Sequence, residues 1–252
     1  MNILPASGQI SGWRASWGKL RAACSPSMIA SVCAGGLVLL AVIGGYRLAQ
    51  WRAVPEYSLY RGAAIRQQAR VIPAGGVLFV GDSIVDQSFT PLICGLPVLN
   101  AGMSGATVAD LFPVARDAIA LAKPALILIS VGINNALPKS RHVSVEAYGE
   151  QLDGMVAAAM ASGARVVLLT QTAVRHDQML SIDLPKLNAI DGTIRNIAEQ
   201  RGTQLVDITA ALAGPDGQMQ SGRTMDGVHL TAAGYAAWHE AIKHVACRSP
   251  AT

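Results

Sequence analysis

The sequence is poor in cysteine, aromatic residues and charge. Its 252 residues include four cysteines, 5% aromatic and 14% charged residues, while 51% are hydrophobic and the mean hydropathy is +0.36. So few cysteines exclude a disulfide-stapled scaffold, and so few charges at this hydrophobicity exclude a disordered chain. The composition predicts one globular domain together with an unusually apolar segment.

Acidic residues are almost absent from the first 70 residues. That stretch has eight Lys and Arg against a single acid, Glu56, which gives a formal charge of +7. Residues 71–252 have 12 basic and 15 acidic residues and a charge of −3. The basic excess belongs to the N-terminal part, so we expect no nucleic-acid-binding surface on the domain that follows.

An apolar run without charge lies between Arg21 and Arg47. Its central 19 residues, 28–46, would span ~28 Å as a helix, close to the thickness of bilayer hydrocarbon. The run lacks the polar face of a core helix, and a poor cleavage site follows it. We therefore expect an uncleaved transmembrane helix, and a cleaved signal peptide is the alternative.

Basic residues flank this run on both sides, so the positive-inside rule does not decide its orientation. We expect the N-terminus inside, because a single N-terminal anchor commonly exports the domain behind it. The protein would then be a single-pass inner (cell) membrane protein with an extracytoplasmic or periplasmic domain. The expected division is a basic tail at 1–27, an anchor at 28–46, a juxtamembrane linker at 47–74 and the domain at 75–248. We expect the linker arginines to face solvent or lipid headgroups.

The four cysteines divide between these parts. Cys24 and Cys33 lie at the expected membrane segment, and Cys94 and Cys247 lie in the domain. Their spacing fits no metal site. In an exported domain, Cys94 and Cys247 form either a disulfide or two buried free thiols.

From Val77 onward, short apolar runs alternate with longer amphipathic stretches. Continuous apolar strands interleaved with helices predict a parallel sheet covered on both faces. The expected fold is a three-layer α/β/α sandwich with a five-stranded parallel, flavodoxin-like sheet, whose ligands bind beyond the carboxyl ends of the strands. The expected strands are Val77–Val80, Val98–Asn100, Ala125–Val131, Arg165–Thr170 and Leu205–Ile208, and the expected helices are Val108–Ala122, Glu146–Ser162, Leu184–Gln200 and Ala232–Ala246.

Four polar segments follow expected strands or precede the last helix. Each alone is compatible with an ordinary turn or helix cap, and the nucleophile motif G-x-S-x-G is absent. The segments are Gly81-Asp82-Ser83, the stretch from Asn100 to Thr107 that contains Gly105, Gly132-Ile133-Asn134-Asn135, and Asp226-Gly227-Val228-His229.

Together and in this order, the segments resemble the blocks of the SGNH (GDSL-type) serine hydrolase family, over about 170 residues from Val77 to Cys247. The resemblance implies a hydrolase of esters or thioesters that needs no cofactor or metal. Its nucleophile would be Ser83, its base His229 and the partner of that base Asp226. The oxyanion hole would consist of the Ser83 and Gly105 backbone N–H groups and the Asn134 side-chain amide. The third block usually ends in Asp where this chain has Asn135, so a carboxylate that would help to order that loop is missing.

The chemistry supports these residue types. A serine hydroxyl needs a neighbouring imidazole to take its proton, and a carboxylate three residues before that histidine can fix its tautomer. Preorganised donors must face the developing oxyanion, and the loss of one typically costs about 10²–10³ in turnover. Arg175 and His176 follow the fourth strand and are candidates for substrate contacts.

The expected function is that of a membrane-anchored serine esterase or deacylase. Its substrate would be an O-acyl ester, with acetyl favoured, of an envelope glycan, and a lipid ester is the next choice. An O-acyltransferase with the same triad is an alternative, because the acyl-enzyme step is identical. A non-catalytic accessory or binding subunit of an envelope polysaccharide system is a third. The sequence identifies no protein partner.

Overall fold

The computed structural model describes residues 26–140, 142–178 and 181–248, and the expected basic tail lies almost entirely outside them. The chain divides into two compact units, Met1–Glu56 and Tyr57–Thr252. Helix α2 (Pro26–Ala69) contains the expected anchor at 28–46 and most of the expected linker at 47–74. The segment Ala30–Arg47 of this helix has a mean hydropathy of 1.6, and none of the segment is buried. This one helix is long and apolar enough to span a membrane or to serve as a signal sequence.

The second unit contains a six-stranded sheet in the order β2-β3-β1-β4-β5-β6. Five strands are parallel, and their order by sequence is the flavodoxin-like 2-1-3-4-5. The expectation of a five-stranded, purely parallel sheet is wrong, because β2 pairs antiparallel with β3 at the edge. The strands are β1 (Val77–Gly81), β2 (Leu92–Ile93), β3 (Leu96–Gly102), β4 (Leu126–Ser130), β5 (Arg165–Leu169) and β6 (Gln204–Val206).

The helices of the second unit begin at capping residues. Thr231 accepts from the Gly234 N–H at 3.2 Å, and Asp183 accepts from the Lys186 N–H at 3.0 Å. The helices are α3 (Ser83–Asp86), α4 (Val108–Ala122), α5 (Val145–Ala161), α6 (Leu184–Arg201), α7 (Ile208–Leu212) and α8 (Ala232–Ala246), with 3₁₀ turns η1 (Ile133–Ala136) and η2 (Pro138–Ser140). The predicted bounds of α4 and α8 are confirmed.

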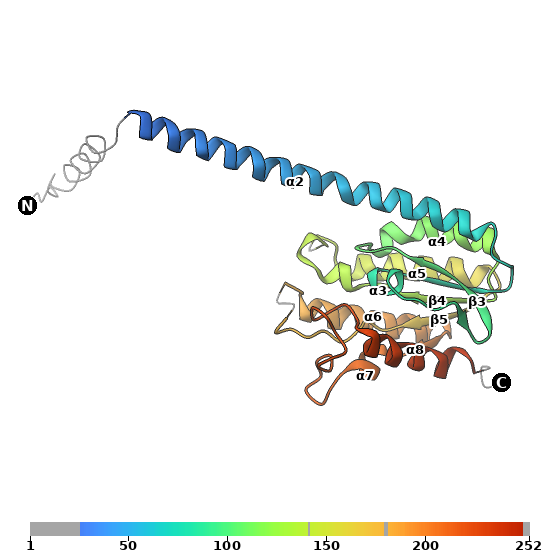
Figure 1. Ribbon diagram of the computed structural model, residues 1–252. Coiled ribbons are helices and arrows are strands. Elements are labelled where there is room, and N and C mark those ends of the chain that lie inside the picture. The colour runs from blue at the N-terminus through green and yellow to red at the C-terminus, as the bar shows by residue number, and fades with distance from the viewer. Residues whose placement is uncertain (1–25, 141, 179–180, 249–252) are drawn as a thin grey trace, which may run out of the picture. The chain divides into compact units, whose positions relative to one another are not determined.

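Alternate residues of the strands face two separate hydrophobic cores. In β1, Leu78 and Val80 join the core formed with α4, α5 and α6, whereas Val77 and Phe79 join the core formed with α7 and α8. Figure 1 shows α4 and α8 on opposite sides of the sheet. The expected burial of the sheet on both faces is thus confirmed, and the carboxyl ends of the strands remain as the edge where loops can form a site.

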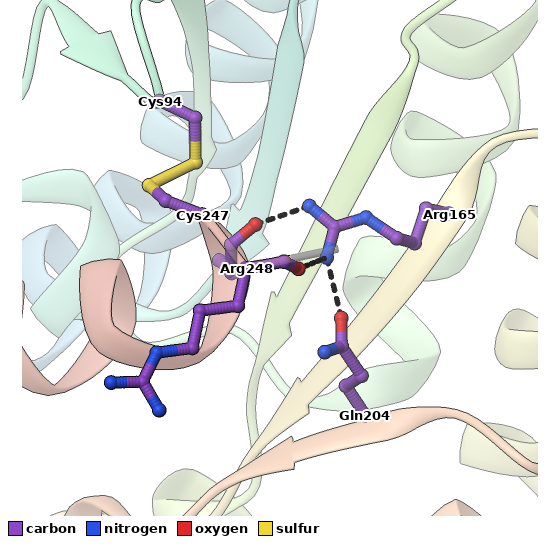
Figure 2. The surroundings of a disulfide bond; sticks show 6 residues. Cys94, Arg165, Gln204, Cys247 and Arg248 are labelled. Carbon is purple, nitrogen blue, oxygen red and sulfur yellow. Dashed lines mark hydrogen bonds between the residues drawn. A yellow bond between two sulfur atoms is a disulfide. The ribbon is translucent and has the colours of Figure 1, made fainter. Parts of the chain in front are cut away.

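A disulfide joins Cys94, in the β2–β3 turn, to Cys247, directly after α8 (Figure 2). The two Cα atoms are 5.1 Å apart, and 153 positions separate the residues in sequence. Arg165, at the start of β5, donates to the backbone carbonyls of Ala246 and Arg248 beside the bond. The structure thus decides between the two states that the sequence allows for these cysteines, and it ties the end of α8 to the sheet edge.

Candidate active site

Ser83 lies directly beyond the carboxyl end of β1, as the first residue of α3. The preceding residue, Asp82, caps this short helix, since its carboxylate accepts from the Ile84 N–H at 3.1 Å. Ser83 is only 7% exposed. The hydroxyl therefore sits at the edge where parallel sheets bind ligands, on a helix with a defined start.

The side chains of Ser83, His229 and Asp226 form a continuous hydrogen-bonded chain. Ser83 Oγ lies 3.0 Å from His229 Nε2, and His229 Nδ1 lies 2.6 Å from Asp226 Oδ2. The other carboxylate oxygen of Asp226 accepts from the backbone N–H groups of His229 at 2.8 Å and Val228 at 3.0 Å. This geometry allows an imidazole to take a serine proton while a carboxylate fixes the tautomer of the ring.

The Asp226 carboxylate is held in its charged form. Partial burial acts to raise the pKa of Asp226, but hydrogen bonds from the His229 ring and from the backbone of His229 and Val228 outweigh it, so the pKa is lowered. An ionised carboxylate beside Nδ1 is what an imidazolium formed during proton transfer requires.

The predicted oxyanion donors lie in the loops after β3 and β4. Gly105 has φ = +76°, a conformation that favours glycine, and its carbonyl accepts from Lys139 Nζ at 2.8 Å. Asn134 is 5% exposed and donates from Nδ2 to the Ala106 carbonyl at 3.1 Å. A primary amide has two N–H groups, so one stays free after this bond. The contact between Asn134 and Ala106 brings the two loops together at the same edge of the sheet.

Asn135 stands where the family that the sequence resembles usually has Asp, and it is 1% exposed. Within the described residues, neither its Oδ1 nor its Nδ2 has a hydrogen-bond partner. The turn is ordered by its backbone instead, because the Asn135 N–H donates to the Gly132 carbonyl at 2.9 Å. The missing carboxylate thus leaves the η1 turn intact.

Arg175, one of the two predicted substrate contacts, supports neighbouring loops. Arg175 donates from its guanidinium to the Met219 carbonyl at 3.1 Å, and from its backbone N–H to the Gly227 carbonyl at 2.8 Å. His176 lines a pocket of about 200 Å³ whose lining does not include Ser83. Arg175 therefore supports the loop that bears His229, and the substrate contacts of both residues remain predictions.

A second polar cluster, which the sequence does not predict, lies beside Ser83 and consists of Tyr57, Arg61, Asp86, Asn100 and Ser104. The expectation that the linker arginines face solvent is wrong for Arg61, whose side chain is 18% exposed and pairs with Asp86. Arg61 and Asp86 are 25 positions apart, so no local pattern could have revealed their contact.

Metal ligands do not gather in the described part of the chain. Among residues 26–140, 142–178 and 181–248, no group of three or more His, Cys, Asp or Glu side chains is arranged to hold a metal ion.

Burial raises the pKa of Asp82 from 3.8 to about 6, although the Ile84 N–H and the nearby His229 act in the opposite direction. Between about pH 4 and pH 6 the folded state binds more protons than the unfolded state, so stability falls as the pH rises through this window and stays lower above it. A shift of about two pH units corresponds to roughly 3 kcal/mol.

We expect Asp82→Asn to abolish this loss of stability, because the amide keeps an acceptor for the Ile84 N–H and cannot ionise. The free energy of unfolding of the variant, relative to the wild type, should rise by roughly 3 kcal/mol between pH 4 and pH 7. Denaturant unfolding of both proteins across this range measures the difference. A difference that does not change with pH would contradict the role assigned to Asp82.

A model of the GDSL-like lipase/acylhydrolase family matches residues 79–237, and a search of curated proteins finds no match. Among solved structures, one described as a platelet activating factor from Streptococcus pneumonia shares 20% identity with this chain at a TM-score of 0.69. The match covers 81% of this chain and 98% of the other.

Two further structures show the same fold. A GDSL-like lipase from Bacteroides thetaiotaomicron shares 20% identity at a TM-score of 0.63, and the match covers 75% of this chain and 97% of the other. An acetyl-xylooligosaccharide esterase from Geobacillus stearothermophilus shares 21% identity at a TM-score of 0.56, covering 69% and 95%. At identities this low, the TM-scores establish a common architecture for the domain and nothing finer.

Proposed function

Because the chain belongs to the GDSL-like lipase/acylhydrolase family, it is a serine hydrolase of ester bonds, and we propose that Ser83, His229 and Asp226 perform this reaction. The observation that carries the assignment is the hydrogen-bonded chain with distances of 3.0 and 2.6 Å. It joins a hydroxyl, an imidazole and a carboxylate in the order that nucleophilic catalysis requires.

The reaction proceeds in two steps. Ser83 Oγ attacks the carbonyl carbon of the ester while its proton passes to His229 Nε2, and that proton then goes to the departing alcohol oxygen as the ester C–O bond breaks. Water next attacks the acyl-Ser83 carbonyl and gives a proton to His229, which returns it to Ser83 Oγ as the carboxylic acid leaves. Asp226 stabilises the imidazolium in both steps.

The oxyanion of each tetrahedral intermediate would be stabilised by three donors. They are the backbone N–H groups of Ser83 and Gly105 and the N–H of the Asn134 amide that does not bond to Ala106. The positive φ of Gly105 and the bond from Lys139 to its carbonyl support this role, because they constrain the backbone on the two sides of the Gly105 Cα atom before the reaction begins.

The apolar part of α2 would anchor this domain outside the cytoplasm. Large apolar side chains in the segment Ala30–Arg47 are exposed, and a continuous exposed apolar surface along a helix is stable in lipid rather than in water. The Cys94–Cys247 disulfide favours an oxidising compartment. In this proposal, residues 1–27 form a cytoplasmic tail, 28–46 the anchor, 47–74 the link and 75–248 the hydrolase domain.

The proposed substrate is an O-acetyl or similar ester of an envelope glycan. Ten positions separate Arg47, at the end of the apolar segment, from Tyr57, where the compact unit begins, and ten extended residues reach at most about 36 Å. An anchored domain would therefore meet substrates at the membrane surface. The fold shared with an acetyl-xylooligosaccharide esterase supports an acetylated saccharide as the class of substrate.

The test uses the full chain in detergent micelles with an O-acetylated xylo-oligosaccharide in water labelled with heavy oxygen. Mass spectrometry should find deacetylated saccharide and acetate that carries one heavy oxygen, and Ser83→Ala should produce neither. Acetyl groups that appear on an added acceptor glycan, without labelled acetate, would establish the acyltransferase instead. Turnover of p-nitrophenyl acetate without any change in the saccharide would overturn the glycan substrate while leaving the esterase intact.

A further inference from the structure

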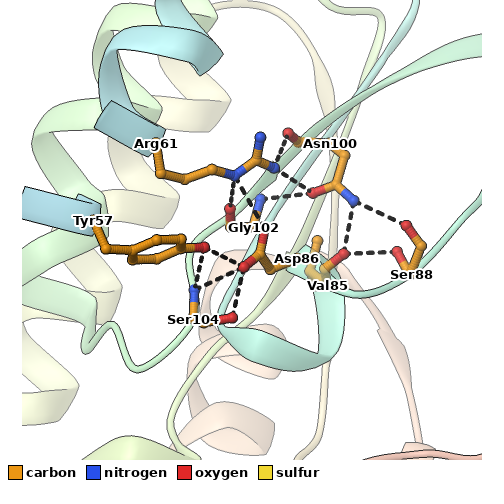
Figure 3. Close-up of polar contacts among 8 residues, drawn as sticks. All are labelled: Tyr57, Arg61, Val85, Asp86, Ser88, Asn100, Gly102 and Ser104. Carbon is orange, nitrogen blue, oxygen red and sulfur yellow. Dashed lines mark hydrogen bonds and ion pairs between the residues drawn. The ribbon is translucent and has the colours of Figure 1, made fainter. Parts of the chain in front are cut away.

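The carboxylate of Asp86, for which the sequence suggests no role, joins the two segments that carry Ser83 and Gly105 (Figure 3). Asp86 is the last residue of α3, and Ser83 is the first. Asp86 Oδ2 accepts from the Ser104 hydroxyl at 2.6 Å and from the Ser104 backbone N–H at 3.2 Å. Ser104 directly precedes Gly105, so this carboxylate ties the helix of the proposed nucleophile to the proposed oxyanion loop.

Helix α2 contributes an ion pair and a hydrogen bond to the same carboxylate. Arg61 Nε lies 3.0 Å from Asp86 Oδ1, and the Tyr57 hydroxyl donates to Asp86 Oδ2. The side chains of Arg61 and Asp86 are only 18% and 16% exposed, so water screens this ion pair far less than it screens a surface pair. Burial and the bond to Asp86 raise the pKa of the Tyr57 hydroxyl, which therefore stays protonated as a donor.

Arg61 also fixes the end of β3, from which the oxyanion loop departs. Its Nε donates to the Gly102 carbonyl at 2.8 Å, and its Nη2 donates to the Asn100 carbonyl at 3.0 Å. Asn100 in turn donates from Nδ2 to the Val85 carbonyl of α3 at 2.7 Å. The two backbones approach so closely that a Cβ on Gly102 would lie 2.1 Å from the Asp86 nitrogen. The end of β3, α3 and the start of the loop thus form one hydrogen-bonded unit.

We propose that Asp86 is a positioning residue: held by Arg61 and Tyr57, it sets the separation of the Ser83 and Gly105 N–H groups that receive the oxyanion. This inference rests on the proposed function. Oxyanion stabilisation depends on donors that are already in place, and a misplacement of about 1 Å can cost 10²-fold in rate. Because α2 supplies two of the contacts, the helix that contains the apolar segment also helps to build the active site.

The test is Asp86→Asn in the full chain in detergent, assayed on p-nitrophenyl acetate. The amide keeps the shape of the side chain but loses the charge and one acceptor oxygen, so Arg61, Tyr57 and Ser104 can no longer all be satisfied. We expect kcat to fall about 10- to 100-fold with KM changed less than threefold, because the donors act on the transition state rather than on the bound ester. The rate of labelling by a fluorophosphonate should fall in parallel.

The matched control is Asp117→Asn, which breaks another ion pair of α2. Arg66 Nε lies 2.7 Å from Asp117 Oδ2 in α4, and this pair touches neither α3 nor the oxyanion loop. The control should keep kcat within twofold of the wild type. Ser104→Ala provides a milder variant, since it removes only the 2.6 Å bond to Asp86. If Ser104 acts through Asp86, the double variant should lose no more activity than Asp86→Asn alone.

The outcomes separate this inference from the proposed function. A wild-type protein without turnover or labelling at Ser83 would overturn the function and the inference together. An active wild type with Asp86→Asn equal to it in kcat per folded molecule would overturn the inference alone. A loss of activity that matches the loss of folded protein, measured by thermal unfolding, would assign Asp86 a purely structural role.

Discussion

Ser83→Ala should lower kcat for ester hydrolysis by about 10⁵- to 10⁶-fold, the effect seen when a serine nucleophile is removed from a catalytic triad. Alanine has no hydroxyl to form the acyl-enzyme, so the variant retains only what the oxyanion donors and substrate binding contribute over water. Hydrolysis of p-nitrophenyl acetate by the full chain in detergent measures the loss. The free energy of unfolding should stay close to that of the wild type, because only one hydrogen bond, to His229, is lost.

Covalent labelling makes this result specific to one residue. A fluorophosphonate should label the wild type at Ser83 alone, and it should label Ser162→Ala as fast as the wild type. Ser162 is a suitable control because its hydroxyl donates to the Ala159 carbonyl at the end of α5 and contacts neither His229 nor Asp226. Labelling that persists in Ser83→Ala would transfer the role of nucleophile to another residue.

The elements that the sequence predicts well are those with local signals. The helix over residues 232–246 has a capping Thr231 and an apolar face, and its predicted bounds agree with α8. The strands are continuous apolar runs, which predict burial on both faces. The candidate site follows from these elements, because its residues lie in segments directly after strands or before the last helix.

The features that the sequence does not predict depend on contacts between distant residues. Strand β2 has only two residues, Leu92 and Ile93, which is too short for any periodic pattern. In the sequence, nothing distinguishes Asp86 from an ordinary polar residue, because its contacts with Arg61 and Tyr57 of α2 exist only in the folded chain. Long-range pairings of this kind leave no mark in spacing or periodicity.

Asn135 illustrates a different limit. The departure from the family pattern is visible in the sequence, but its consequence is not. In the structure its side chain is buried without hydrogen-bond partners among the described residues, while its backbone N–H closes the η1 turn. The cost of the departure is therefore an unsatisfied buried amide, and the position of Asn134 is maintained.

Loss of the Cys94–Cys247 disulfide should lower the free energy of unfolding of the domain by about 5 kcal/mol. The bond closes a loop of 153 positions, and the chain-entropy model gives about this stabilisation for a loop so long, because the link restricts the unfolded chain. Cys94→Ala/Cys247→Ala measures the effect in denaturant unfolding. Dithiothreitol should destabilise the wild type to the same extent and leave the double variant unchanged.

Cys33 supplies the control for this measurement, because it is exposed and unpaired in α2. Cys33→Ala should unfold like the wild type and respond equally to dithiothreitol.

Cys94 and Cys247 also report on the side of the membrane on which the domain lies, since disulfides persist in oxidising compartments and are rare in the cytosol. After membrane-permeable thiol alkylation of intact cells, Cys94 and Cys247 should remain unmodified. Their alkylation under native conditions would place the domain in a reducing compartment and overturn the proposed orientation, whereas the loss of stability on mutation would still hold for the oxidised protein.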